Sequence, residues 1–98
     1  GLAWPSLASG IASLEATYTQ VATPKLDWWG VDWYGRIWLK LSCSTPGATM
    51  RYTVDGSTPQ WYSPVCKKWL IVTGTGTLKV RAFKNGMVPS HVLVIRIR

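Results

Sequence analysis

Short segments in which apolar and polar residues alternate constrain the fold more than any other feature of this sequence. Segments 36–43, 48–55, 76–84 and 91–98 show this period of two, and 67–72 is a continuous apolar run. Alternation places every second side chain on the same face, which is typical of a strand with one buried side. Reversals at intervals of about 8–12 residues separate the segments, as in all-β sandwiches and barrels.

Two of the reversals have a specific turn chemistry. Asp55-Gly56 follows one expected strand and Asn85-Gly86 follows another. Both dipeptides tolerate positive φ angles, so we predict a structural turn at each. With 9 glycines and 6 prolines in 98 residues, long helices have little room. The pattern predicts an all-β fold in a single domain.

The N-terminal residues admit two interpretations. Leu7, Ile11 and Leu14 have helical spacing behind a capping Ser6. Alternation over 11–22 fits an extended strand at least as well. We therefore treat residues 1–21 as an N-terminal extension and 22–98 as the β-sandwich module.

Composition and charge limit the classes of partner. The chain is 47% hydrophobic and 15% charged, enough for a core, and it carries a net charge of +7. No apolar stretch approaches the ~18 residues of a membrane helix. The basic residues occur mostly singly between apolar ones, as on solvated strand faces, so we predict no nucleic-acid partner. An acidic polysaccharide stays a weak alternative partner.

The sequence contains few residues that could act in catalysis. The four carboxylates are scattered, and His91 is the single histidine. A paired-carboxylate hydrolase, a metal site or a Ser-His-acid arrangement finds no support in this spacing. We predict a protein that is not an enzyme, with no catalytic residue, no metal and no cofactor.

Tryptophan is the most unusual component, with 7 residues. Indole rings fill small cores, but exposed rings also stack on sugars and form contacts between proteins. By alternation Trp38 faces away from the core side of its strand. We predict an exposed aromatic binding surface made by Trp28, Trp29, Trp33, Trp38 and Trp61.

Two stretches, "LSCSTPGATMRYTVDGSTP" and "LKVRAFKNG", resemble the chitobiase/β-hexosaminidase C-terminal domain family over about residues 24–93. The resemblance implies an immunoglobulin-like β-sandwich of about seven strands that carries no catalytic residues. It also implies an accessory module of secreted enzymes and surface proteins. Two departures stand out, since the chain has no catalytic domain to assist and has an extra N-terminal segment.

Cys43 and Cys66 can form one intrachain bridge or remain two buried thiols. We predict the bridge, which would add about 3 kcal/mol and implies an oxidising compartment. The chain starts at Gly1 rather than Met, as after export or trimming. Together with the resemblance, these features predict a secreted or cell-surface protein.

An extended N-terminal segment could add a strand to the sheet edge of a neighbouring copy, and such head-to-tail contacts build filaments. We predict a structural subunit of a surface filament, a homo-oligomeric polymer, and a carbohydrate-binding module as the alternative. The donor segment is predicted to use Ile11, Leu14, Ala16, Tyr18 and Val21.

Overall fold

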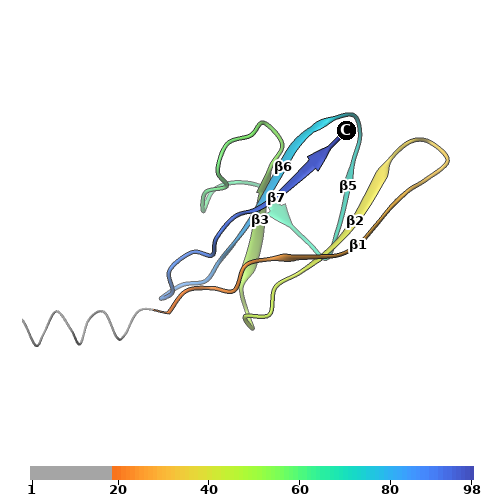
Figure 1. Ribbon diagram of the computed structural model, residues 1–98. Coiled ribbons are helices and arrows are strands. Elements are labelled where there is room, and N and C mark those ends of the chain that lie inside the picture. Colours follow the sequence, from red (N-terminus) through yellow and green to blue (C-terminus); the bar gives the residue numbers. More distant parts are fainter. Residues whose placement is uncertain (1–18) are drawn as a thin grey trace, which may run out of the picture.

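The computed structural model describes residues 19–98, which form seven strands in two antiparallel sheets (Figure 1). The three-stranded sheet has the order β1-β2-β5, and the four-stranded sheet has the order β4-β3-β6-β7. The prediction of an all-β sandwich of about seven strands is confirmed. The strands are β1 (Lys25–Val31), β2 (Ile37–Ser42), β3 (Thr49–Thr53), β4 (Val65–Cys66), β5 (Trp69–Val72), β6 (Gly76–Phe83) and β7 (Leu93–Ile97).

Alternation located β2, β3, β6 and β7 correctly, each to within a few residues, and the continuous apolar run over 67–72 located β5. It did not identify β1, because the register shifts between Leu26 and Trp28. A bulge of this kind places an extra residue in one strand and breaks the period of two. β4 is only two residues long, too short to carry a periodic signal.

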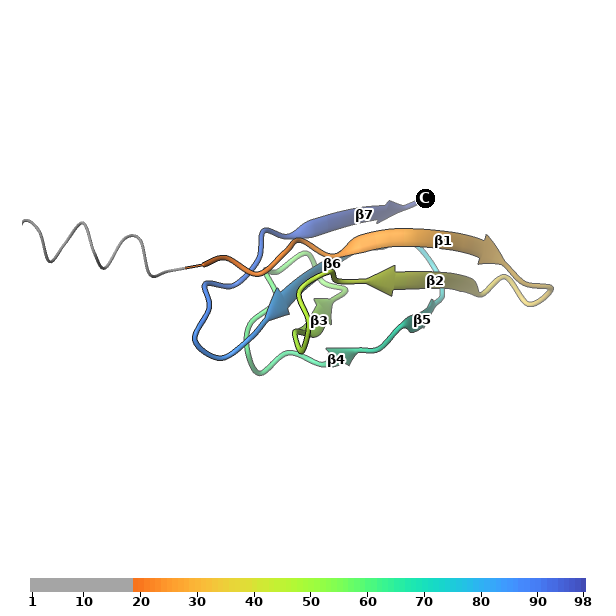
Figure 2. The same ribbon diagram turned by 90° about the horizontal axis from the view of Figure 1, so that it is seen from below.

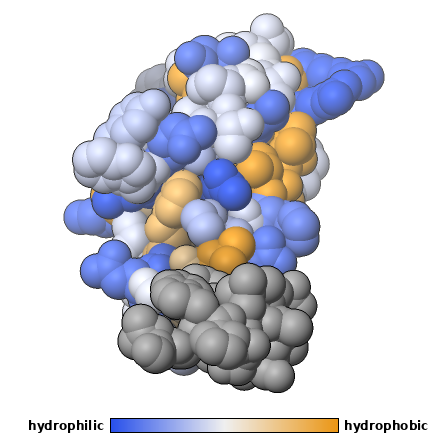
Figure 3. Space-filling view, turned by 90° about the vertical axis from the view of Figure 1, so that its left-hand side faces the viewer, coloured by the Kyte–Doolittle hydropathy of each residue, from blue (hydrophilic) through white to orange (hydrophobic). Residues whose placement is uncertain are grey.

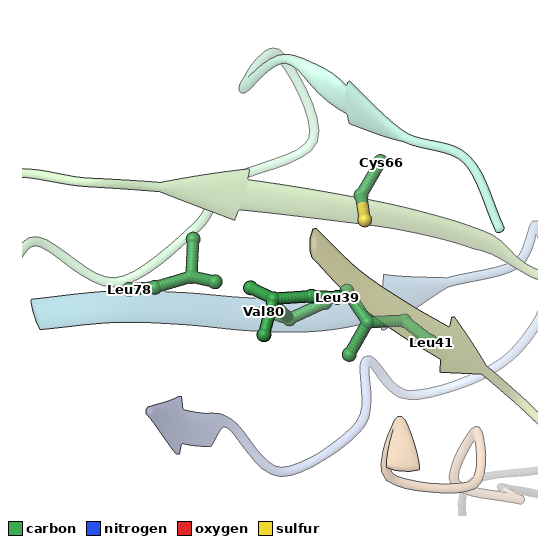
Figure 4. Close-up of a cluster of buried hydrophobic side chains, with 5 residues drawn as sticks. All are labelled: Leu39, Leu41, Cys66, Leu78 and Val80. Atoms are coloured by element: carbon green, nitrogen blue, oxygen red, sulfur yellow. The ribbon is translucent and has the colours of Figure 1, made fainter. Parts of the chain in front are cut away.

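The core lies between the two sheets. Leu39 and Leu41 of β2 face Leu78 and Val80 of β6, and Cys66 of β4 completes the cluster (Figure 4). Each of these side chains is at most 3% exposed. Burying a leucine or valine contributes about 1.5–3 kcal/mol, so this small cluster is the main source of stability. The inward and outward residues of β2 and β6 are those that alternation predicts.

The beginning of the described chain is attached to the module itself. The backbone N–H of Val21 donates to the Val88 carbonyl at 2.9 Å, and the N–H of Val88 donates to the Thr19 carbonyl at 2.9 Å. Val21 is 1% exposed. Beyond this contact β1 and β7 run in the same direction, each in its own sheet (Figure 2). Val21 of the predicted donor segment thus lies in its own chain's interior, while Ile11, Leu14, Ala16 and Tyr18 lie outside the described residues.

The predicted bridge between Cys43 and Cys66 is not formed in this structure, where both thiols are free. Cys43 follows β2, and its thiol donates to the Ala22 carbonyl at 3.2 Å. Cys66 lies in the other sheet, opposite Met50 of β3. Burial raises the pKa of the Cys66 thiol to about 11. The two side chains thus belong to different sheets and have different neighbours.

The surface is mixed where Figure 3 shows it, from the left-hand side of Figure 1. On that face hydrophobic residues form separate patches between hydrophilic ones. Scattered hydrophobic residues of this kind are normal on the surface of a small domain.

Candidate functional site

The outer face of the three-stranded sheet brings several tryptophans together. Because Leu39 and Leu41 point into the core, their neighbours Trp38 and Lys40 point outward. Lys40 pairs with Trp28 of β1 on one side and with Trp69 of β5 on the other. Three tryptophans from three strands are thereby brought together, and we call Trp28, Trp38, Trp69 and Lys40 the aromatic face.

The rings of the aromatic face contact one another edge to face. The centroids of Trp28 and Trp69 are 5.8 Å apart at 73°, and those of Trp38 and Trp69 are 6.2 Å apart at 75°. The Lys40 ammonium lies 6.0 Å from the Trp69 centroid. Such pairs contribute about 0.5–1.5 kcal/mol each beyond their burial. The rings therefore support each other while Trp28 and Trp69 remain 52% and 45% exposed.

Gly30 of β1 creates the place for the Trp28 ring. A Cβ atom added at Gly30 would lie 2.5 Å from Cη2 and 2.9 Å from Cζ2 of Trp28. The indole consequently lies across the backbone of Gly30, closer than any other residue type allows. Trp28 nonetheless stays 52% exposed, so part of its ring is open to a ligand.

Asp32 fixes the hairpin that joins β1 to β2. Its Oδ1 accepts the backbone N–H groups of Tyr34 at 2.8 Å and Arg36 at 3.0 Å. Its Oδ2 accepts the indole N–H of Trp38 at 3.0 Å and the Nε–H of Arg36 at 2.7 Å. These bonds, the Trp38 indole first and then those of Arg36 and Tyr34, hold the pKa of Asp32 well below its usual range against the opposing effect of desolvation. An ionised Asp32 thus orients Trp38 on the aromatic face.

Two further aromatic residues occupy the tip of this hairpin. Trp33 is fully exposed and Tyr34 is 83% exposed, with the Arg36 guanidinium 5.1 Å from the Tyr34 ring centroid. The tip follows β1 directly, so these rings extend the aromatic surface past the end of the sheet.

The predicted set of exposed tryptophans separates into different places. Trp28 and Trp38 share the aromatic face, Trp33 lies at the hairpin tip, and Trp29 lines a groove between β1 and β7. Trp61 lies in the connection between β3 and β4, edge-on to Tyr62 with centroids 5.5 Å apart. All are exposed except Trp38, which is half-buried.

Sequence reasoning missed Trp69 and Gly30. Trp69 lies in a run that reads as uniformly apolar, although within β5 Trp69 and Ile71 are exposed while Leu70 and Val72 are half-buried. Applying the period of two to this run would have placed Trp69 on the same face as Ile71 and opposite to Leu70. No local pattern identifies Gly30, because its role depends on the ring of Trp28.

The two predicted turns adjoin strands of the four-stranded sheet and are not part of the aromatic face. Gly56 and Gly86 have φ angles of +85° and +80°, in the left-handed region that favours glycine. The Asp55 carboxylate accepts the hydroxyl and the backbone N–H of Ser57, and these bonds, the hydroxyl first, lower the pKa of Asp55. Asp55 therefore closes a turn by local hydrogen bonding.

Within residues 19–98 no three His, Cys, Asp or Glu side chains gather as metal ligands would. The same part of the chain contains no helix that is long and apolar enough to cross a membrane. His91 is exposed. The clearest candidate site among the described residues is thus the aromatic face, and exposed aromatic rings of this kind are suited to binding a ligand.

A comparison with protein families gives the context of this surface. The family model of the chitobiase/beta-hexosaminidase C-terminal domain matches residues 32–94. The chain belongs to this family. The chitobiase/β-hexosaminidase C-terminal domain is a non-catalytic accessory module that occurs with glycosidases. No significant match to a curated protein or to a solved structure was found. The family match begins at Asp32, so β1 with Trp28 and Gly30 precedes it.

Proposed function

We propose that the protein is a non-catalytic carbohydrate-binding module that acts outside the cell. The observation that carries the proposal is the aromatic face, in which three strands bring Trp28, Trp38 and Trp69 together. Sugar rings present C–H groups, which are attracted to the negative face of an indole, and a rigid aromatic ring loses little entropy on binding. Membership of a family that accompanies glycosidases gives a reason for a glycan ligand and for secretion or a cell-surface location.

The geometry of the aromatic face suits a polymer better than a small molecule. Trp28 and Trp69 lie on opposite sides of Lys40, on the first and last strands of the sheet. A chain of sugars crossing the strands would contact both rings, and the Lys40 ammonium beside Trp69 would donate to hydroxyl or acetamido oxygens. We therefore propose neutral polysaccharides such as chitin or cellulose as the ligand class.

Affinity electrophoresis in gels that contain soluble chitin or cellulose derivatives tests the proposal. We expect Trp28→Ala and Trp69→Ala each to weaken retention about tenfold or more, as for a ring at the centre of an interface. Trp29→Ala, which removes an exposed ring from the groove between β1 and β7, is the matched control and should be retained like the native chain. Retention on no polysaccharide, or equal loss in all three variants, would refute the proposal.

A second candidate function, filament assembly by strand addition, is supported by the groove between β1 and β7. Each of these strands is at the edge of its sheet, and edge strands offer unpaired backbone groups to an added strand. The groove has a volume of about 340 Å³ and is lined mainly by apolar side chains, including Leu26, Trp29, Ile37, Ile95 and Ile97.

Under this candidate function residues 1–18 of one copy would supply a strand to the groove of the next copy. Thr19 and Val21 already bond to Val88 within the same chain, so the donated residues would include Ile11, Leu14, Ala16 and Tyr18. A variant lacking residues 1–18 should stay monomeric in sedimentation and electron microscopy where the full chain forms filaments. A truncated chain that still polymerises, or a full chain that is always monomeric, would refute filament assembly and leave glycan binding unaffected.

A further inference from the structure

The outer face of the four-stranded sheet carries basic side chains. Leu78, Val80 and Ala82 point into the core, so Lys79 and Arg81 of β6 point outward. Arg51 of β3 is directly opposite Arg81 in the register of the two strands. Like charges at opposed positions destabilise a sheet, and this pair has no carboxylate between its members. A bound anion would reduce the repulsion between Arg51 and Arg81 and so stabilise the sheet.

The two guanidinium groups are held in place by backbone carbonyls. Nη1 of Arg51 donates to the Ser63 carbonyl at 2.7 Å, and Nε of Arg81 donates to the Ser90 carbonyl at 2.8 Å. Each guanidinium has five N–H groups, and within residues 19–98 each uses one of them in a side-chain hydrogen bond. The remaining N–H groups form preoriented donors, which is the arrangement that binds carboxylates and sulfates well.

A pocket of about 360 Å³ adjoins Arg51. Its volume is in the range of small-molecule sites, about 300–1,000 Å³. Its walls include the rings of Trp61 and Phe83 and the side chain of Lys84. Trp61 is 72% exposed and is supported edge-on by Tyr62, as an indole that stacks on a ligand should be.

No carboxylate lines this pocket. Among the described residues, Asp27 and Asp32 belong to the other sheet and its hairpin, and Asp55 lies past the far end of β3. Lys84 is fixed by a bond of 2.7 Å from its Nζ to the Pro46 carbonyl, which keeps its charge at the rim. The pocket therefore combines a stacking ring with cations that have no neighbouring counter-charge.

We propose that this pocket binds an acidic sugar, such as a uronic acid unit, with its ring on Trp61 and its carboxylate toward Arg51 and Lys84. The site is on the sheet opposite the aromatic face, so the inference does not depend on the proposed binding of neutral glycans. A single concave site with one exposed indole fits a sugar unit better than a nucleic acid, which requires a row of cations along a backbone and successive stacking rings.

The test uses a short oligogalacturonate as the probe, with a neutral oligosaccharide and a single-stranded oligothymidine for comparison. Binding is measured by calorimetry at low and physiological salt, and the indole N–H signals of the native chain are followed by NMR. Lys84→Gln has a matched control in Lys67→Gln, which removes an exposed cation from the connection between β4 and β5. Trp61→Ala has a matched control in Trp29→Ala, which removes an exposed ring from the groove between β1 and β7. Thermal unfolding of every variant checks that each is folded.

We expect oligogalacturonate to shift the Trp61 indole signal and the neutral oligosaccharide to leave it unchanged. Lys84→Gln and Trp61→Ala should each weaken oligogalacturonate binding about tenfold, while each control changes it less than about twofold. Equal weakening by Lys67→Gln would show general charge attraction and overturn the proposal. Tighter binding of oligothymidine than of oligogalacturonate would also overturn it, and so would no binding at either salt concentration.

Discussion

Replacing Gly30 by alanine tests whether this glycine is needed to position the Trp28 ring or to fold β1. The new Cβ would lie 2.5 Å from Cη2 of Trp28, so one of the two must move. The contact is at the far end of a flexible side chain, whereas Gly30 is fixed in a sheet between Val31 and Trp29. The indole should therefore leave its position, while the backbone of β1 stays in place.

The expected magnitudes follow from the contacts involved. Moving the Trp28 ring loses one edge-to-face pair with Trp69, worth about 0.5–1.5 kcal/mol. Gly30 does not have a positive φ, so alanine fits its backbone. Alanine also lowers the conformational entropy of the unfolded chain, which stabilises the folded protein by about 0.4–1 kcal/mol. The net change in the free energy of unfolding should stay within about 1 kcal/mol, or about 4–8 °C in Tm.

Glycan binding should respond much more strongly than stability. A displaced central ring costs about 2 kcal/mol, which is roughly a thirtyfold loss of affinity for chitin or cellulose derivatives. Affinity electrophoresis measures this loss, calorimetric melting measures Tm, and the indole N–H signal of Trp28 reports the displacement. Gly30→Ala with native affinity and an unshifted Trp28 signal would refute the reasoning. A collapse of Tm would show instead that Gly30 is needed for folding.

Three further predictions concern the fold that supports the site. Since the folded-state pKa of Asp32 is depressed below its unfolded value of about 3.9, the stability that its bonds to Trp38 and Arg36 provide should be complete at neutral pH. That stability should fall as the pH drops below about 4 toward the folded-state pKa. Asp32→Asn should lower Tm at pH 7 and flatten this dependence, which melting curves from pH 2 to 7 would measure. Leu39→Ala should cost about 2–5 kcal/mol in urea unfolding because it opens a cavity in the five-residue core cluster. The Cys66 thiol, with a pKa of about 11, should react with alkylating reagents at pH 8 only at the rate of unfolding, and rapid labelling of the native protein would contradict this.

The parts of the fold that follow a period of two could be predicted from sequence, because burial of one sheet face dictates them. β6 is the clearest case, since Leu78, Val80 and Ala82 are all buried. β1 could not be predicted because its bulge breaks the alternation.

The candidate site was only partly accessible to sequence reasoning, because pairing between distant strands creates it. Alternation within β2 indicates that Trp38 faces outward, but its neighbours depend on the order of β1, β2 and β5 in the sheet. Trp69 reaches the site through its pairing with Lys40, a relation across nearly thirty residues that one sequence does not disclose. The N-terminal prediction depended on local alternation alone, and the long-range bonds of Val21 to Val88 had no local signal.

The family match covers only part of the aromatic face. The match begins at Asp32 and contains every strand of the four-stranded sheet except the last residues of β7. Trp38 and Trp69 lie within the match, but Trp28 and the glycine beneath it lie before it. Two tryptophans of the aromatic face thus lie within the matched residues, and the third belongs to the strand that precedes them. Because β1 pairs with β2 and its Leu26 packs against the core cluster, the strand that carries Trp28 is an integral part of the sandwich although it precedes the match.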